Sequence, residues 1–163
     1  MVSARDTGDV RILRHNKGLT RAERTTADLR KVTIEQVAER RFRITVKLRH
    51  LAASHARWDQ TTIIGFTETR GDWPEAGVVL QQHRDFKAFA YRNSAGTTCS
   101  LKLTRSPTRR TLSVVVPKRC MPPEGWQGWV KTSTEIVDEP VAVEPTWTVF
   151  SRDFMRLPKV RYR

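Results

Sequence analysis

The segment from Arg41 to Arg49 constrains the fold more than any other part of the chain. Apolar side chains hold every even position of this segment, and cationic or hydroxyl side chains hold every odd position. Successive side chains of a β-strand point to opposite faces, so the pattern predicts a strand that buries one face and exposes a row of positive charge on the other. Such a strand is typical of an antiparallel sheet with one face in water.

Other short apolar segments recur along the chain, with turn signals such as Asn16-Lys17-Gly18 and Asn93-Ser94-Ala95-Gly96 between them. About eight to ten short strands at a spacing of about ten residues are typical of a sandwich or barrel. We therefore expect an all-β fold, an antiparallel β-sandwich of the jelly-roll or immunoglobulin-like kind. The expected strands span residues 10–14, 29–36, 41–49, 61–67, 77–82, 87–91, 99–104, 111–116, 128–137 and 146–150.

One of these strands has an alternative. A helix over about residues 26–40 would carry Leu29, Val32 and Val37 on one side, but this stripe is irregular. The β-branched residues of the segment also lower its helix propensity, so we prefer the strand.

The length of 163 residues fits a single domain, and we expect one sandwich domain over residues 1–163. The C-terminal segment 151–163 is basic. We expect it to be a flexible tail unless it docks on the domain.

The chain has two cysteines, Cys99 and Cys120, at the edges of two predicted strands that bracket a hairpin. This placement favours a disulfide, which would contribute about 3 kcal/mol in the chain-entropy model. Two buried free thiols are the alternative. Neither cysteine has a histidine near it in the sequence, which argues against a thiol nucleophile or a zinc site.

The N-terminal residues bear on export. Val2-Ser3-Ala4 resembles the small-x-small end of a signal-cleavage site, although the printed residues contain no intact signal peptide. We therefore expect a secreted or cell-surface protein, in agreement with the disulfide. No apolar stretch reaches transmembrane length, so we expect no membrane insertion.

Five short elements follow one another in a recognisable order. They are Asp6 to Val10, the segment from Arg41 to Arg49, Cys99 to Leu101, Val116 to Cys120, and Gly128 to Val130. This order resembles small secreted β-sandwich proteins of actinobacteria that carry one disulfide and have no assigned function. The resemblance implies secretion and a bonded Cys99–Cys120 pair, and it supplies no catalytic residues.

Positive charge is the strongest functional signal. The chain has 30 Lys and Arg against 17 Asp and Glu, a net charge of +13. This excess attracts anionic polymers, although a solvated basic surface without a ligand has the same composition. The candidate anion-binding residues come from the segment 41–49 and the window 99–120: Arg41, Arg43, Lys47, Arg49, Lys102, Arg105, Arg109 and Arg110. No sequence motif for reading nucleic-acid bases accompanies them.

Tryptophans provide a second signal. Five of them lie at predicted strand ends or loops. Exposed aromatic rings stack on sugars, whereas buried ones close the ends of a sandwich. Trp73 and Trp126, which have Gly, Pro and acidic neighbours, are the candidates for a glycan site.

Catalytic and metal-binding patterns are sparse. His50, His55 and Asp59 cluster in the sequence but need a further partner to bind metal or act as a base. Asp6 and Asp9 flank Gly8 and provide only two carboxylates for calcium, which is typical of a turn. We predict no cofactor, no metal and no catalytic residue.

Three hypotheses follow. The first is a non-enzymatic binding or structural module whose basic surface holds an anionic polymer, such as a cell-wall polymer or nucleic acid bound without sequence preference. The second is a carbohydrate-binding module that uses exposed tryptophans. The third is an enzyme whose site is scattered over several loops, with His50 or His55 in it.

Overall fold

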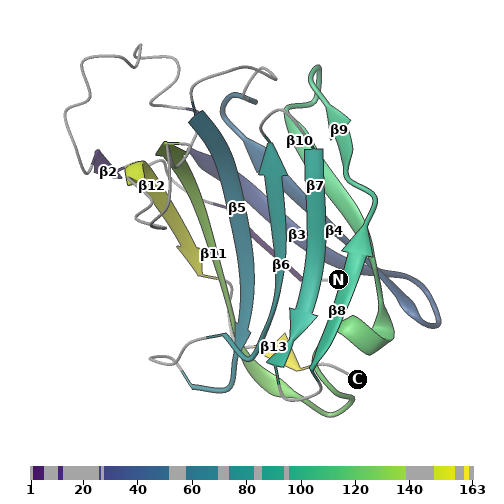
Figure 1. The fold of residues 1–163 in the computed structure, drawn as a ribbon. Helices are drawn as coiled ribbons and strands as arrows, with labels where there is room; N and C mark the ends of the chain where they lie inside the picture. The colour runs from purple at the N-terminus through teal and green to yellow at the C-terminus, as the bar shows by residue number, and fades with distance from the viewer. Residues whose placement is uncertain are drawn as a thin grey trace.

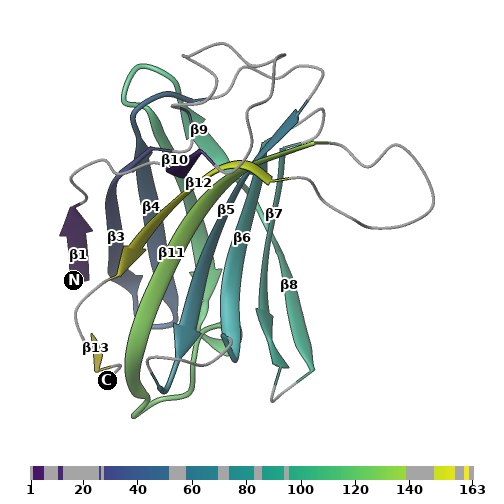
Figure 2. The ribbon, with the colours of Figure 1, turned by 90° about the vertical axis from the view of Figure 1, so that its left-hand side faces the viewer.

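The computed structural model describes residues 2–5, 11–12, 26, 28–51, 58–69, 74–82, 86–93, 96–138, 149–156 and 160–161. These residues form two antiparallel β-sheets that stack face to face and do not close into a barrel (Figure 1). In Figure 2 the two layers stand side by side, with β3 and β4 in one and β5 to β8 in the other. The predicted all-β antiparallel sandwich is therefore confirmed.

The smaller sheet has five strands in the order β1-β3-β4-β10-β9. Their bounds are Val2–Arg5 for β1, Leu29–Ala38 for β3, Arg41–Leu48 for β4, Thr111–Pro117 for β10 and Thr104–Ser106 for β9. The predicted strand at 29–36 is confirmed against the helical alternative, because residues 29–38 pair along β4. Since β4 pairs with β3 on one side and β10 on the other, it is the central strand of this sheet.

The larger sheet has eight strands, seven of them in the order β2-β12-β11-β5-β6-β7-β8. Their bounds are Arg11–Ile12 for β2, Val149–Arg156 for β12, Gln127–Asp138 for β11, Trp58–Thr67 for β5, Ala76–Gln82 for β6, Phe86–Arg92 for β7 and Thr97–Leu101 for β8. The eighth, β13 (Val160–Arg161), also pairs with β11. A short 3₁₀ helix, η3 (Lys118–Cys120), follows β10.

The described residues hold thirteen strands, more than the eight to ten expected. One reason is that the segment expected to be a single strand at 99–104 is split between β8 and β9, which belong to different sheets. The other additional strands are β1 and β13, in segments where we expected none. The last expected strand, at 146–150, lies further along as β12, so residues 151–156 of the expected tail pair with β11.

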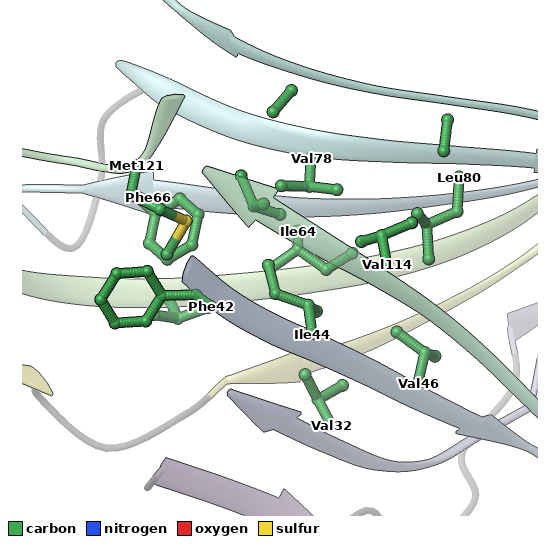
Figure 3. Packing of buried hydrophobic residues seen from close by; sticks show 14 of the residues in the cluster. Val32, Phe42, Ile44, Val46, Ile64, Phe66, Val78, Leu80, Val114 and Met121 are labelled. Atoms are coloured by element: carbon green, nitrogen blue, oxygen red, sulfur yellow. The ribbon is translucent and has the colours of Figure 1, made fainter. Parts of the chain in front are cut away.

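The alternating segment 41–49 has the predicted two faces. The four apolar side chains of β4 are at most 7% exposed, and the cationic ones between them are exposed. Figure 3 shows Ile44 and Val46 of β4 in the same layer as Val32 and Val114, facing Ile64 and Val78 of the opposite sheet. Burial of these side chains between the sheets is the main source of stability of the fold, since apolar area removed from water contributes about 25 cal/mol per Å².

Trp126, one of the two candidates for an exposed, glycan-binding ring, is only 6% exposed and belongs to the core. Its ring meets Phe66 edge to face, with ring centroids 5.8 Å apart and an interplanar angle of 83°. The aromatic ring therefore closes the interior, as buried tryptophans commonly do, instead of standing in solvent as a sugar platform.

The predicted disulfide is confirmed: Cys99 and Cys120 are bonded, with their Cα atoms 6.4 Å apart. Cys99 lies in β8, at the edge of the larger sheet, and Cys120 lies in η3, directly after β10 of the smaller sheet. The bond therefore connects the two sheets. Both cysteines are at most 5% exposed, so they also contribute apolar surface to the core.

Removal of this bond tests its contribution to the fold. The cysteines are 21 residues apart, so the chain-entropy model predicts that their bond adds about 3 kcal/mol to the free energy of unfolding. We expect the Cys99→Ala/Cys120→Ala variant to unfold at a correspondingly lower urea concentration. A midpoint equal to that of the parent protein would contradict a stabilising cross-link between the sheets.

Candidate cationic site

The outer face of the five-stranded sheet is organised in rows that cross the strands. Residues directly opposite each other on neighbouring strands share a face, so the register assigns each outward residue to a row. In one row Lys31 of β3 stands opposite Lys47 of β4, which stands opposite Thr111 of β10. The next row carries hydroxyl groups from four strands: Thr33, Thr45, Ser113 and Thr104.

The opposition of Lys31 and Lys47 lowers the stability of the protein when no ligand is bound. Directly opposed residues of an antiparallel pair have Cβ atoms about 5 Å apart, and like charges at that separation repel. Within the described part of the chain, neither lysine has an ion pair with an acid.

These two lysines belong to a depression of about 560 Å³, which we name the cationic hollow. It is lined by Arg30, Lys31, Lys47, Leu48, Arg49 and Arg110. Five of these six described residues are cationic. The hollow lies where β3 begins, β4 ends and the turn between β9 and β10 closes, so segments distant in sequence supply its charges.

An irregularity in β3 brings Arg30 into the hollow. Leu29 is opposite Leu48 and Lys31 is opposite Lys47, so the register shifts between them and Arg30 has no partner on β4. In a regular strand, consecutive side chains point to opposite faces. A bulge re-aims side chains, which accounts for the presence of both Arg30 and Lys31 at the same hollow.

The turn before β10 fixes Arg110 on the other side. Arg110 has a left-handed backbone with φ of 56°, its N–H donates to the carbonyl of Pro107 at 3.1 Å, and its carbonyl accepts the N–H of Leu48 at 3.0 Å. A positive φ is uncommon for a residue with a side chain. The bond to Leu48 anchors this turn to the end of β4, beside Arg49.

Asp28 provides the only acidic partners that the structure describes for these five cations. Its Oδ2 accepts hydrogen bonds from Arg30 Nη2 at 2.9 Å and from Arg49 Nη1 at 3.4 Å. The residue is 2% exposed, so its carboxylate lies below the surface. One negative charge is therefore shared between two arginines, and the described residues leave the hollow with a positive excess.

A second depression of about 620 Å³, which we name the hydroxyl groove, lies beside the hollow on the same face. Its lining includes Thr45, Thr104, Thr111 and Ser113. Charged residues border it: Arg43, Lys102, Arg109 and Glu35. Arg43 is partly neutralised, because its Nη1 lies 3.3 Å from Glu35 Oε1.

The eight predicted anion-binding residues are thus divided among several places. Lys47, Arg49 and Arg110 meet at the cationic hollow, whereas Arg43, Lys102 and Arg109 border the hydroxyl groove.

Two of the eight lie elsewhere. Arg41 is opposite Pro117, at the other end of β4. Arg105 is opposite the core residue Leu112 and therefore occupies the face of β9 that turns away from this surface.

Sequence reasoning missed Arg30, Lys31 and Asp28. The strand expected at 29–36 contains both cations, but only the register places Lys31 beside Lys47. No residue pattern in the sequence predicts the irregularity at Arg30 or the burial of Asp28.

The other candidate residues do not form a site in the described residues. Trp73, His55, Asp6 and Asp9 lie outside them, as does the side chain of Asp59, whereas His50 is exposed. No group of three or more His, Cys, Asp or Glu suited to a metal ion occurs among the side chains described. The same part of the chain has no helix of the length and apolarity needed to cross a membrane.

Tyr91 has a shifted pKa for a structural reason. Burial raises its pKa above the usual 10.0. Tyr91 stands opposite Gly77 on the larger sheet, and a Cβ at position 77 would come within 2.7 Å of its ring. The ring covers this glycine, far from the cationic row of the smaller sheet.

The cost of the opposed lysines is measurable. Lys31→Glu converts a repulsive cross-strand pair into an attractive one, so we expect the free energy of unfolding to rise by about 0.5 kcal/mol in low salt. Arg119→Glu is the matched control, because it makes the same change of net charge on η3, where Arg119 is exposed. Denaturant unfolding gives the free energy of unfolding of both variants. If Lys31→Glu is no more stable than Arg119→Glu, the two lysines do not repel each other measurably.

Comparison of the chain with protein-family models, with curated proteins and with solved structures finds no match. The function must therefore be inferred from the residues of this chain and their arrangement.

Proposed function

We propose that this chain is a non-enzymatic binding module that holds an anionic polymer on the outer face of its five-stranded sheet. The observation that carries the proposal is the cationic hollow, where five Lys and Arg side chains from three segments surround one depression. Positive charges gathered on one face raise the local concentration of anionic ligands and hold them by neutralising their charges.

The opposition of Lys31 and Lys47 supports this proposal. A sequence that served only folding would place an acid opposite Lys31 or Lys47, because opposite charges across a strand pair stabilise the sheet. Places where local stability is lost without an internal gain are commonly functional. A bound polyanion would remove the repulsion by supplying the missing negative charges.

The geometry supports a polymer that crosses the strands. Neighbouring strands lie about 4.8 Å apart, so the row through Lys31 and Lys47 presents charges along a line perpendicular to β4. The hydroxyl groove continues the same face toward β9, and Thr111 belongs to both the cationic row and the groove. The hydroxyl groups of the groove provide neutral hydrogen-bond partners next to the charges.

We propose that the module acts outside the cell or at its surface. The disulfide between Cys99 and Cys120 supports this compartment, because such bonds persist in oxidising environments. The resemblance to secreted β-sandwich proteins with one disulfide is a second reason for proposing this compartment.

The alternative module, which would bind neutral glycans through tryptophan rings, has less support. Trp126 is buried against Phe66, so it provides no platform for a sugar. Trp73, the other candidate, lies outside the described residues.

Binding to long-chain polyphosphate tests the proposal. We expect the affinity to fall steeply between 50 and 200 mM NaCl, by about tenfold or more, since each neutralised charge adds to the salt dependence. Lys47→Glu should weaken binding by about tenfold at low salt, because it replaces a contact with repulsion.

Arg119→Glu is again the control, since a net charge of +13 gives any basic surface some affinity. Arg119 lies in η3, beyond the far end of β10, and that end is about 20 Å from Thr111 at the ordinary rise of a strand. Equal losses in the two variants would show attraction to overall charge and contradict a site on this face. Salt-insensitive binding to a neutral glycan such as dextran would instead favour the alternative module.

A further inference from the structure

We infer that the cationic hollow contains a subsite for a tetrahedral oxyanion, a phosphate or sulfate group, and that Asp28 is the positioning residue that orients Arg30 and Arg49 for it. This inference rests on the proposed function and specifies the chemical group that the polymer carries.

Asp28 is built into the hollow as a support. Its side chain is 3% exposed, whereas those of Arg30 and Arg49 are 34% and 51% exposed. Its main-chain carbonyl also accepts the N–H of Arg49 at 2.8 Å. Both the backbone and the side chain of Asp28 therefore hold Arg49, and the side chain holds Arg30 as well.

The two arginines keep donors for a ligand. Each guanidinium has five N–H groups, and the bonds to Asp28 involve one nitrogen of each, Nη2 of Arg30 and Nη1 of Arg49. The remaining donors keep a planar arrangement that suits phosphate and sulfate oxygens. Because Asp28 fixes one nitrogen of each arginine, less side-chain freedom is lost when a ligand binds.

The distribution of cations favours a tetrahedral group over a carboxylate. The hollow receives positive side chains from β3, from the end of β4 and from the turn that carries Arg110. A phosphate or sulfate group directs its oxygens in several directions and can accept from several sides at once. A carboxylate has two oxygens in one plane, which a single guanidinium satisfies.

Removal of the Asp28 charge changes anion affinity in opposite directions, depending on whether Asp28 is a simple counter-charge or a positioning residue. Asp28→Asn removes a negative charge and raises the net charge by one from +13. Long-range attraction alone predicts tighter binding of any anion by this variant. The positioning role predicts weaker binding of tetrahedral groups, because the amide loses the charge-assisted bonds that hold the two arginines.

The experiment compares three polymers of similar length by calorimetry at low salt: polyphosphate, dextran sulfate and poly-glutamate. For the full chain we expect polyphosphate or dextran sulfate to bind at least about tenfold tighter than poly-glutamate, and the tighter of the two identifies the preferred oxyanion. Asp28→Asn should lose this preference, with poly-glutamate binding unchanged or tighter. Asp28→Asn binding the tetrahedral polymers as tightly as the parent, or tighter, would overturn the inference.

A second variant covers the case in which Asp28→Asn does not fold. Arg49→Lys keeps the charge but replaces the guanidinium with a point charge, so we expect the same loss of preference. Arg119→Lys is the control and should keep it. Retention of the preference by Arg49→Lys would overturn the inference.

The two proposals fail differently. If the parent protein binds none of the three polymers, the proposed function is wrong. If the parent binds all three equally and Asp28→Asn binds them more tightly, the binding surface stands and the tetrahedral subsite is wrong.

Discussion

β4 pairs with a neighbour on each side, and the two registers that it forms decide what both faces of the smaller sheet present. On the inner face they align the core residues Ile44 and Val114 with Ile34, which packs against the core. On the outer face the same registers align Lys47 with Lys31. Because a shift by one residue would exchange the two faces, core packing fixes the surface charges as firmly as it fixes the core. The cationic hollow is therefore a consequence of the packing between the sheets.

Under the proposed function, the outer face is a compromise between folding and binding. The core is apolar and the disulfide links the two sheets, so the fold has stabilising interactions that can offset a local repulsion. Asp28 neutralises part of the charge at the hollow, but it lies below the surface and its bonds go to Arg30 and Arg49. Lys31 and Lys47 keep their charges toward the solvent side, where a polyanion would meet them.

Much of the fold could be predicted because it depends on local alternation. The pattern of residues 41–49 predicted β4 and its two faces, and the β-branched residues near Val32 favoured a strand over a helix. The strand ends at Cys99 and Cys120 favoured their disulfide. The site was less predictable, because register, bulges and burial depend on distant segments. Lys47 was identified without Lys31, and Arg30 was missed at an irregularity of β3. Trp126 was a candidate for an exposed ring, although it packs on Phe66.

We propose that this chain binds anions on the face formed by β3, β4 and the turn before β10. Backbone amide chemical shifts recorded by NMR during titration with a short polyphosphate test it most directly. We expect the largest changes on residues 28–31, 45–49 and 108–111, with little change in β6 and β7 of the other sheet. Changes centred on the larger sheet, or spread evenly over all basic residues, would contradict it.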